Sequence, residues 1–489
     1  MSSTEPPVVV IGTGPTGAVA AATLVARGVS VLVLESGDQA PGGLVVKAAG
    51  RTVFRKPDQT QLRNNRNSSP PGRPSDWWSA LTPGGLSNYW TAAVPRFAPD
   101  DFNVGASVDE RYKWPFEYSD LEPFYETAEH YLTITNDQPI LGIPHGVGAH
   151  HRRAPRGWQP VIDAAAAAGE GIGLTPAAIG NRWMAARRTT EFESYRCVVA
   201  PLESSQELKV RRRAHVSSIH WSSTAGRVDG VMISDQSGGP DVFQPAQAVV
   251  LAAGTIDSTA VLLRSTSSDH PDGLGNADGI LGRYLHDHPR EWFLAELDSP
   301  KPCLDHPLLV ARASHHETGL LATQHSIGLG APVDRLRAWA GRSSRRHGVN
   351  VFSTMIPTDD LGVRLEADPG GGRNDRIEIA LSYDGSAIDN LRANRDRLRD
   401  IFALAGISMT TDDPFQMPVP GSSVHLGGSI RMHNRAEFGV LDKWNQLHHG
   451  DGLVVCDASC FTTSPEKNPT LTAMAIAIRA ADHLADQLG

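Results

Sequence analysis

The chain has 489 residues, a formal net charge of −9 and an isoelectric point near 6.1, which argues against nucleic acid as a main partner. Hydrophobic residues make up 40% of it and charged residues 20%, as in globular proteins, and no apolar run is long enough to cross a membrane. The first residues carry no secretion signal, and the four cysteines lack the spacing of a zinc or thiol redox site. We therefore expect a cytoplasmic protein with reduced cysteines that binds neither metal, membrane nor nucleic acid.

The first predicted element is a buried strand, residues 8–11, that enters a glycine-rich turn and then an alanine-rich helix up to Arg27. In a G-x-G-x-x-G turn the first glycine permits the tight turn, the second lets the backbone approach a pyrophosphate, and the third allows close helix–strand packing. A second strand, residues 29–34, ends in Glu35, whose carboxylate can accept a hydrogen bond from a ribose hydroxyl. The pattern predicts a dinucleotide site at the N-terminus of the helix, with its turn formed by Gly12, Gly14 and Gly17.

Two later segments, an insertion and a further strand followed by a helix, also have the character of a nucleotide-binding domain. An insertion rich in turn-forming residues, residues 41–86, contains a Gly-Gly pair that begins at Gly84. Residues 248–255 form another buried strand with small residues, followed by a helix near Ile256, and residues 210–216 are suited to border an adenine. The glycine-rich turn alone does not separate NAD from FAD, but this second return to the nucleotide-binding sheet favours a flavoprotein.

Between these segments we expect helices and an antiparallel sheet. Ser119 is a candidate helix N-cap, with Glu122 at the capping-box position. Strand patterns suited to an antiparallel sheet occur at residues 291–297, 308–311, 325–329, 349–355 and 377–382. A helix is expected at 392–405, and residues 420–489 return to the cofactor-binding part with a last helix at 470–484.

The C-terminal region holds a histidine and an asparagine that suit the oxidation of an alcohol. His425 has an unperturbed pKa near working pH and can take a hydroxyl proton as a general base, while Asn468 can donate a hydrogen bond to the developing alkoxide. His425 also lies beside Gly427-Gly428, where backbone can approach a ligand closely. Each residue has a structural alternative, because a lone histidine among 19 is more often structural and Asn468-Pro469 fits a turn before the last helix.

Two other motifs have open interpretations. His286-Asp287-His288 has the spacing of metal ligands, but it precedes Pro289 and no metal is predicted there. Trp77-Trp78 and Trp90 suit either stacking against a sugar or the protein core.

Three segments together resemble the glucose–methanol–choline (GMC) oxidoreductase family, and the resemblance covers nearly the whole chain. They are Gly84 to Thr91 (GGLSNYWT) followed by Pro95-Arg96-Phe97, His425 to Met432 (HLGGSIRM), and Asn468 to Met474 (NPTLTAM). Within the family the chain looks most like pyranose oxidases and bacterial C-glycoside 3-oxidases. The resemblance implies an α/β fold in which a Rossmann-like FAD-binding domain is interleaved with a substrate domain on an antiparallel sheet. The implied boundaries are 1–110 (with a flavin loop at 41–97), 191–290 and 420–489 for the FAD-binding domain, and 111–190 and 291–419 for the substrate domain.

The resemblance also implies roles for single residues. His425 is expected to be the catalytic base and Asn468 its partner, with Thr91 and Ser353 in the substrate site. Cofactor contacts are expected from Gly12, Gly14, Thr16, Gly17, Glu35, Ser36, Gly85, Ser87, Asn88, Trp90, Thr91, Val216, Ala253, Gly254, Asp457, Asn468, Pro469 and Thr470.

Two departures from the family patterns matter. In fungal pyranose oxidases a histidine directly before the tryptophan of the flavin loop binds FAD covalently. Tyr89 occupies that position here, which predicts non-covalent FAD. Ser429 and His433 replace the more usual Thr and Gly around Arg431-Met432, and the first replacement keeps a hydroxyl.

The expected reaction is oxidation of a secondary alcohol at C3, or C2, of a pyranose sugar or glycoside, with hydride transfer to flavin N5 and reduction of O2 to H2O2. Alternatives are a GMC dehydrogenase that uses a quinone or another acceptor, an enzyme acting on a non-sugar alcohol such as a sterol or choline, and a catalytically silent flavin-binding scaffold. The polar substrate half, without an extended apolar run, favours sugars, and intact His425 and Asn468 argue against the silent scaffold. The chain is shorter than fungal pyranose oxidases, so a monomer is expected rather than a tetramer.

Overall fold

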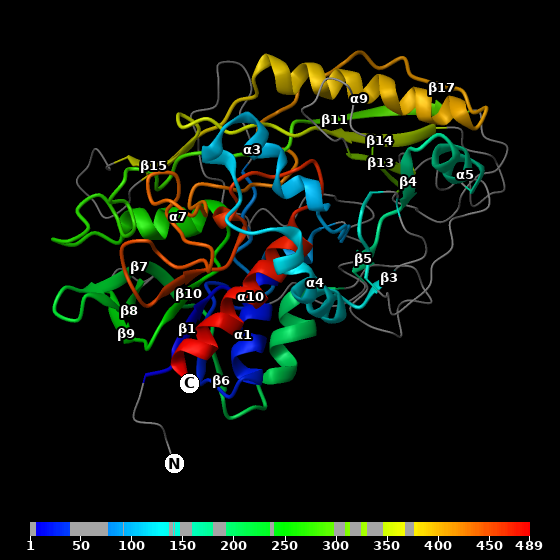
Figure 1. The fold of residues 1–489 in the computed structure, drawn as a ribbon. Coiled ribbons are helices and arrows are strands. Elements are labelled where there is room, and N and C mark those ends of the chain that lie inside the picture. The colour runs from blue at the N-terminus through cyan, green and yellow to red at the C-terminus, as the bar shows by residue number, and fades with distance from the viewer. Residues whose placement is uncertain are drawn as a thin grey trace.

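The computed structural model describes residues 6–39, 77–90, 92–135, 140, 142–146, 159–178, 192–234, 239–297, 309–312, 324–329, 346–366 and 376–489. Most of the predicted flavin loop 41–97, and Thr91 with it, lies outside the described residues. Figure 1 shows one part of the molecule built around a parallel sheet near both termini, and another built around an antiparallel sheet beneath a long helix.

The parallel sheet combines strands from three distant parts of the chain. In spatial order its described strands are β18 (Leu453–Val455), β10 (Val249–Leu251), β1 (Val8–Ile11), β2 (Val31–Leu34) and β6 (Leu208–Arg211). Strands β1, β10 and β18 consist of apolar residues that are buried at every position, as expected for parallel strands covered on both faces. The predicted interleaving of N-terminal, central and C-terminal segments in one cofactor-binding sheet is confirmed.

Helices rich in small residues cover this sheet. Helix α1 (Pro15–Ala26) and helix α10 (Thr470–Leu488) lie side by side (Figure 1), and the buried alanines of both allow close packing. Helix α4 (Tyr118–Leu132) packs on α10, and α7 (Thr255–Arg264) follows β10. The predicted N-cap of α4 is wrong, because the cap is Glu117 and its backbone N–H donates to Asp120 Oδ2 at 2.9 Å. The capping pair is therefore shifted two residues towards the N-terminus from Ser119 and Glu122.

The segment predicted to border an adenine is divided between two sheets. Strand β6 ends at Arg211, and β7 (His215–Ser222) begins an antiparallel sheet with β8 (Arg227–Ser234) and β9 (Val242–Pro245). Arg213, between them, has a positive φ of 54°, so the chain turns sharply there. Residues 210–216 are therefore not one edge strand.

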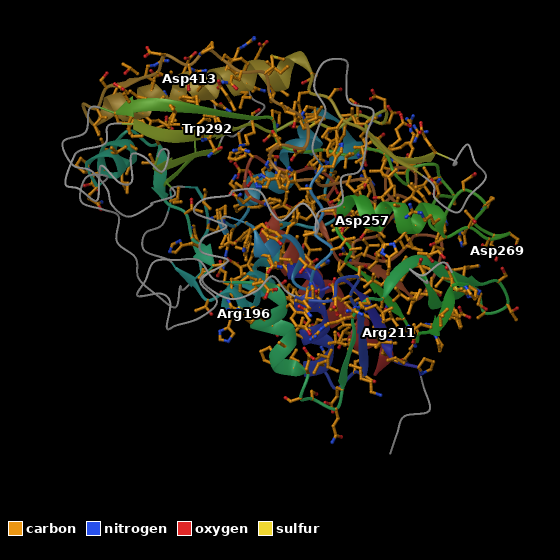
Figure 2. All side chains as sticks on the ribbon, turned by 180° about the vertical axis from the view of Figure 1, so that it is seen from behind. Arg196, Arg211, Asp257, Asp269, Trp292 and Asp413 are labelled. Atoms are coloured by element: carbon orange, nitrogen blue, oxygen red, sulfur yellow. The ribbon has the colours of Figure 1, made fainter. Side chains whose placement is uncertain are left out.

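The antiparallel sheet forms the second part of the molecule. Its described strands are, in spatial order, β17 (Met409–Thr410), β11 (Arg290–Leu297), β14 (Arg346–Phe352), β13 (Gln324–Leu329), β12 (Leu309–Arg312) and β4 (Gly171–Leu174). Helix α9 (Gly385–Leu404) lies across one face (Figure 1) and buries Leu391, Leu398 and Phe402 against Phe293 and Val351. This helix begins seven residues before the predicted start because the Asp384 side chain caps it by accepting from Ala387 N at 2.8 Å. Figure 2 shows Trp292 and Asp413 on this part, and Arg196 and Arg211 on the part with the parallel sheet.

The described residues also form shorter elements. They are α3 (Val104–Val108), α5 (Gln159–Ala167), and the strand pairs β3 (Ile134–Thr135) with β5 (Ala177–Ala178) and β15 (Gly362–Glu366) with β16 (Arg376–Ala380). Among the described residues, no helix combines the length and apolar character needed to span a bilayer. Of the described cysteines, Cys456 and Cys460 are buried free thiols.

Candidate active site

The glycine-rich turn after β1 leaves open space at one of its three glycines. A Cβ atom on Gly12 would lie 2.5 Å from the Ala252 carbonyl oxygen, and one on Gly17 would collide with the Gly12 carbonyl. A Cβ atom on Gly14 would meet nothing within 4 Å. The first and third glycines are thus required for close backbone packing, and the second faces the space into which a pyrophosphate is expected to fit.

The surroundings of Gly14 fit an anionic dinucleotide. Helix α1 begins at Pro15, and no described side chain caps it, so its N-terminal N–H groups and its dipole are directed to this space. A Cβ atom on Gly85 would lie 3.7 Å from Gly14 Cα, and one on Gly254 would meet nothing within 4 Å. Three glycines from three different loops therefore leave room for a cofactor at the carboxyl ends of β1 and β10.

Glu35 fixes the shape of the glycine-rich turn. Its Oε1 accepts from Gly37 N at 2.7 Å, and its Oε2 accepts from Thr13 N at 3.2 Å and from the Thr13 hydroxyl. Gly84 N donates to the Thr13 hydroxyl at 2.9 Å, which joins the predicted flavin loop to the turn. Burial raises the pKa of Glu35, and these hydrogen bonds oppose that shift. Oε1, which accepts one of these three hydrogen bonds, keeps acceptor capacity for a ribose hydroxyl.

The polar side chains of the predicted flavin loop hold the loop itself. The Ser87 hydroxyl donates to Gly84 O at 2.5 Å and accepts from Ser194 N at 3.0 Å. Asn88 Nδ2 donates to Pro83 O and Gly85 O, both at 2.9 Å. The Trp90 indole donates to Phe192 O at 3.1 Å. Their predicted contacts with the cofactor remain predictions, and Thr91 lies outside the described residues.

Asp457 joins the ends of two neighbouring strands. Its Oδ2 accepts from Gly254 N at 2.9 Å and from the Ser258 hydroxyl at 2.5 Å, while Oδ1 accepts from Ser459 N at 2.9 Å. The Ser258 hydroxyl also accepts from Ala253 N at 3.0 Å. The carboxylate thereby fixes the turn between β10 and α7, which borders the open space at Gly254.

The remaining predicted cofactor and substrate residues differ in their burial and hydrogen bonds. Thr16 is buried in the first turn of α1, and the Ser36 hydroxyl lies 3.2 Å from His215 Nδ1. Val216 is 3% exposed within β7. Ser353 is completely buried and donates to Ala387 O at 3.1 Å, so the geometry gives no support to its predicted contact with substrate.

His425 and Asn468 are brought together as predicted from distant segments. His425 Nε2 lies 2.9 Å from Asn468 Nδ2, and both side chains are partly exposed. Asn468 precedes Pro469, the N-cap of α10, so the pair lies at the N-terminus of that helix, which starts at Thr470. With this amide orientation Asn468 donates, and His425 Nε2 therefore carries a lone pair.

A second histidine, which the sequence analysis did not place in the site, continues this hydrogen-bonded row. His288 Nδ1 lies 2.9 Å from His425 Nδ1, and the Phe352 ring lies 5.4 Å from the His425 ring. Since His425 Nε2 is an acceptor, its proton is on Nδ1 and is donated to His288. Burial, with a smaller contribution from the positive charge of Arg290, lowers the pKa of His425 to about 3. His425 is therefore neutral across the physiological pH range, with a lone pair on Nε2.

Asp287 holds the loop that carries His425. This completely buried carboxylate accepts from His425 N at 3.0 Å and from the Ser423 hydroxyl through Oδ1, and the Tyr383 hydroxyl lies 3.4 Å from Oδ2. Between its two partners, Val424 has a φ of 60°, a left-handed conformation that a β-branched residue rarely adopts and that costs about 1–3 kcal/mol. Burial raises the pKa of Asp287, and the hydrogen bonds it accepts from the loop oppose that shift. The sequence motif His286-Asp287-His288 was the available signal for this role.

The Gly427-Gly428 pair packs closely on His286, and its expected approach to a ligand stays a prediction. A Cβ atom on Gly427 would lie 2.6 Å from His286 Nε2, and one on Gly428 would lie 2.8 Å from His286 Nδ1 and collide with the Tyr284 carbonyl. Burial lowers the pKa of His286 to about 4, so its ring is neutral. Within the part of the chain that the structure describes, no group of His, Cys, Asp or Glu is arranged to hold a metal ion.

Comparison with protein families gives a result that agrees with this geometry. Models described as GMC oxidoreductase match residues 116–290 and 373–477, more than half of the chain, and a model described as NAD(P)-binding Rossmann-like domain matches residues 10–52. This chain belongs to the GMC oxidoreductase family. The predicted family, its interleaved α/β fold and an oxidoreductase acting on CH–OH groups are confirmed, and FAD is the cofactor of this GMC enzyme.

Named relatives span most of this GMC chain. The 6'''-hydroxyparomomycin C oxidase of Streptomyces lividus is 27% identical over 98% of this chain and 91% of its own. The 2-methyl-1,2-propanediol dehydrogenase of Mycolicibacterium austroafricanum is 25% identical over 99% and 96%. The C-glycoside 3-oxidase of Microbacterium trichothecenolyticum is 24% identical over 83% and 75%. Among solved structures, pyridoxine 4-oxidase from Mesorbium loti has a TM-score of 0.70 at 19% identity, covering 98% of this chain and 99% of its own, which shows the shared fold.

Proposed function

We propose that this GMC enzyme oxidises a secondary alcohol of a pyranose sugar or glycoside, at C3 or C2, to a keto-sugar and passes the electrons to O2. The observation that carries the proposal is the contact of 2.9 Å between Asn468 Nδ2 and His425 Nε2. It brings a hydrogen-bond donor and the lone pair of a neutral imidazole to the same point at the N-terminus of α10. A substrate hydroxyl bound there gives its proton to His425 Nε2 and receives a hydrogen bond from Asn468 as negative charge develops on its oxygen.

FAD, when bound, supplies the hydride acceptor for the carbon that loses its hydrogen. The residues suited to hold it are Gly14 with the N-terminus of α1, Glu35 for the ribose, and the turn that Asp457 fixes beside Gly254. The uncapped N-terminus of α10, next to Asn468, favours negative charge in its vicinity. The protein thus contributes position, electrostatics and the movement of one proton.

The names of the relatives support a sugar-like substrate. The hydroxyparomomycin and C-glycoside oxidases are named for an aminoglycoside and a glycoside. Near His425, Arg290 donates to Asn350 Oδ1 at 2.8 Å and to Ser422 O at 2.9 Å, so polar groups border this region. These features favour a polyhydroxylated substrate over an apolar alcohol.

The main alternative is a dehydrogenase that passes electrons to a quinone or another acceptor. The relative named 2-methyl-1,2-propanediol dehydrogenase supports this alternative and a smaller alcohol as substrate. The acceptor and the substrate are therefore tested together.

The test is anaerobic mixing of the FAD-loaded enzyme with glucose, an aryl C-glycoside and an aryl O-glycoside, while the visible flavin band is followed. Bleaching by a sugar or glycoside supports the proposed substrate class, and the small diol is the control for the alternative. Readmission of O2 restores the band rapidly in an oxidase and slowly in a dehydrogenase. Bleaching by the diol alone would overturn the sugar assignment.

The attachment of FAD has its own test. Tyr89 stands where a covalent linkage would need a histidine, so denaturation of the enzyme is expected to release all of its flavin into solution. Flavin absorbance that stays with the precipitated protein would contradict non-covalent binding.

A further inference from the structure

A row of buried polar groups leads away from His425 on the side opposite Asn468. His425 Nδ1 lies 2.9 Å from His288 Nδ1, and His288 Nε2 lies 3.1 Å from the Ser464 hydroxyl. His288 and Ser464 are 1% and 2% exposed, so the protein shields both from solvent. Among the described residues, the Ser464 hydroxyl donates over a long distance of 3.3 Å to Pro465 O, a contact that it can exchange for another acceptor.

Ser464 borders a small cavity that two carboxylate residues also line. The cavity measures about 10 Å³, room for one water molecule, and Asp101 and Glu466 form part of its wall. Lys467 Nζ lies 2.8 Å from Asp101 Oδ2 and 2.8 Å from Glu466 Oε1. One ammonium group therefore faces two carboxylates, and we call these three residues the buried acid cluster. The cluster is almost completely buried and, when ionised, has one negative charge in excess.

One oxygen of this cluster lacks a partner. Glu466 is 1% exposed, yet its Oε2 has no hydrogen-bond partner among the described residues. A buried carboxylate oxygen in this state needs an explanation, because it loses its hydration without a compensating donor. The adjoining cavity has room for one water molecule, which can supply that donor.

We propose that His288, Ser464 and Glu466 form a proton relay that carries the substrate hydroxyl proton from His425 into the buried acid cluster. The proposal rests on the proposed function, in which His425 is the base. His288, Ser464 and Glu466 act through His425 and are positioning and proton-carrying residues that do not touch the substrate.

The relay moves one proton and no electrons. The alcohol O–H bond breaks as an N–H bond forms at His425 Nε2, and the proton on His425 Nδ1 passes to His288 Nδ1. The proton on His288 Nε2 passes to the Ser464 oxygen, whose own proton passes to Glu466 Oε2 through a water molecule that the cavity has room to hold. Both imidazoles end neutral, and in each ring the proton has moved from one nitrogen to the other. The net charge of the buried acid cluster changes from −1 to zero.

The environment of His425 and His288 favours passing the proton on over holding it as an imidazolium cation. Burial lowers the pKa of His425 to about 3, and burial together with His425 holds the pKa of His288 well below its ordinary value. Neither ring holds a second proton as a cation at neutral pH. In the relay each ring releases one proton as it accepts another, so no imidazolium forms.

The first test compares Glu466→Gln with Glu170→Gln in the FAD-loaded enzyme. Glu170 is a control because it is also a buried carboxylate, 3% exposed, but it pairs with Arg397 in the other part of the molecule. The measurement is the rate of anaerobic flavin bleaching by glucose or an aryl C-glycoside from pH 5 to 9. We expect Glu466→Gln to lower the rate roughly tenfold near pH 6, a part of what a general base contributes, and Glu170→Gln to leave it unchanged.

The pH profile separates a relay from a purely structural role. Asp101 and Lys467 face Glu466 and are unchanged in the variant, so the rate of Glu466→Gln is expected to recover as hydroxide or buffer base takes over the proton at higher pH. A loss equal at every pH, or no loss, would overturn the relay. Ser464→Ala is expected to reproduce the loss and the recovery, whereas Ser464→Thr, which keeps the hydroxyl, is expected to retain the rate.

A spectroscopic measurement tests the relay without any substrate. In the resting enzyme labelled with ¹⁵N-histidine, nuclear magnetic resonance is expected to show His425 protonated on Nδ1 and His288 on Nε2. A proton on His288 Nδ1 would overturn the relay. If no sugar bleaches the wild type, the proposed substrate fails and the tautomers still decide the relay. If a sugar bleaches the wild type and Glu466→Gln equally, the relay fails and the proposed function stands.

Discussion

Two buried carboxylates each fix a turn or loop beside the candidate site, and they differ in how far along the chain their partners lie. Glu35 binds Thr13 and Gly37, in turns that follow adjacent strands of the parallel sheet. Asp287 binds Ser423 and the backbone of His425, more than a hundred residues away. Burial raises the pKa of both groups. The first carboxylate belongs to the cofactor turn and the second to the base loop, so removal of each is expected to affect a different step.

The largest effect is expected on the base-loop side, at the base itself. His425→Ala removes the proton acceptor and should lower the rate of anaerobic flavin bleaching by roughly 10²–10⁴-fold. The glycine-rich turn is untouched, so the variant should remain yellow with a normal amount of FAD. A bleaching rate equal to that of the wild type would remove His425 as the base.

Asp287→Ala is expected to have the next largest effect. It leaves the Ser423 hydroxyl and His425 N without their acceptor and releases the strained Val424, so His425 is no longer fixed against Asn468. Hydrogen bonds to a charged group contribute about 1.5–3 kcal/mol, which predicts a loss of turnover of roughly ten- to hundredfold with FAD still bound. Asp287→Asn keeps one acceptor oxygen and is the matched control, expected to lose less. Equal turnover in Asp287→Ala and the wild type would show that the loop holds its shape without the carboxylate.

Glu35→Gln tests the cofactor side of the comparison. The amide accepts from Gly37 but cannot accept from Thr13 with its NH2 group, so the turn loosens by about 1–3 kcal/mol. We expect the Kd for FAD, measured by titration of the apoenzyme, to rise roughly 5- to 150-fold. The bleaching rate per bound flavin should not change. A variant that binds FAD normally but turns over slowly would contradict the division between the two carboxylates.

The pH dependence of the flavin bleaching rate is a further test of the base loop, and its expected effect is smaller. The pKa of His425 is lowered to about 3, so its neutral form dominates above that pH and is lost only as the pH falls towards 3. Arg290 and His288 face its ring and Asp287 binds its backbone. We expect the rate of flavin bleaching to change less than about twofold between pH 5.5 and 8. An unshifted histidine with a pKa of about 6.5 would instead give a loss of roughly tenfold at pH 5.5.

The smallest effect is expected on the stability of the folded protein when the Gly427-Gly428 pair is changed. Gly428→Ala places a methyl group at a φ of 78° and against the Tyr284 carbonyl and His286. Gly226→Ala has a φ of 64° but meets nothing within 4 Å, so it carries the backbone strain alone. We expect the free energy of unfolding to fall by about 1–3 kcal/mol more in Gly428→Ala, read as a lower Tm. Equal Tm values would show that the loop moves away from His286 at no cost.

The sequence was most informative for site residues whose hydrogen-bond partners lie close to the end of a strand. The G-x-G-x-x-G turn and Glu35 follow β1 and β2, so a short pattern was enough to predict that they lie close together. His425 and Asn468 were predicted as a pair through the family pattern, although 43 residues separate them. Asp287 and His288 were singled out only for metal-like spacing, because their partners lie in a loop whose position depends on the whole fold. The shift of the α4 cap from Ser119 to Glu117 shows that a capping pattern fixes an element but not its first residue.

The parallel sheet is built from strands that lie far apart in the chain, and this has a consequence for biosynthesis. Strand β18 leaves the ribosome long after β10, and β10 remains with one unpaired edge until β18 arrives. An exposed strand edge is a site for pairing with other chains, and domains normally begin to fold as their segments emerge. The parallel sheet of this protein can therefore be completed only after β18 has been synthesised, so nascent chains arrested before residue 453 should be prone to aggregation.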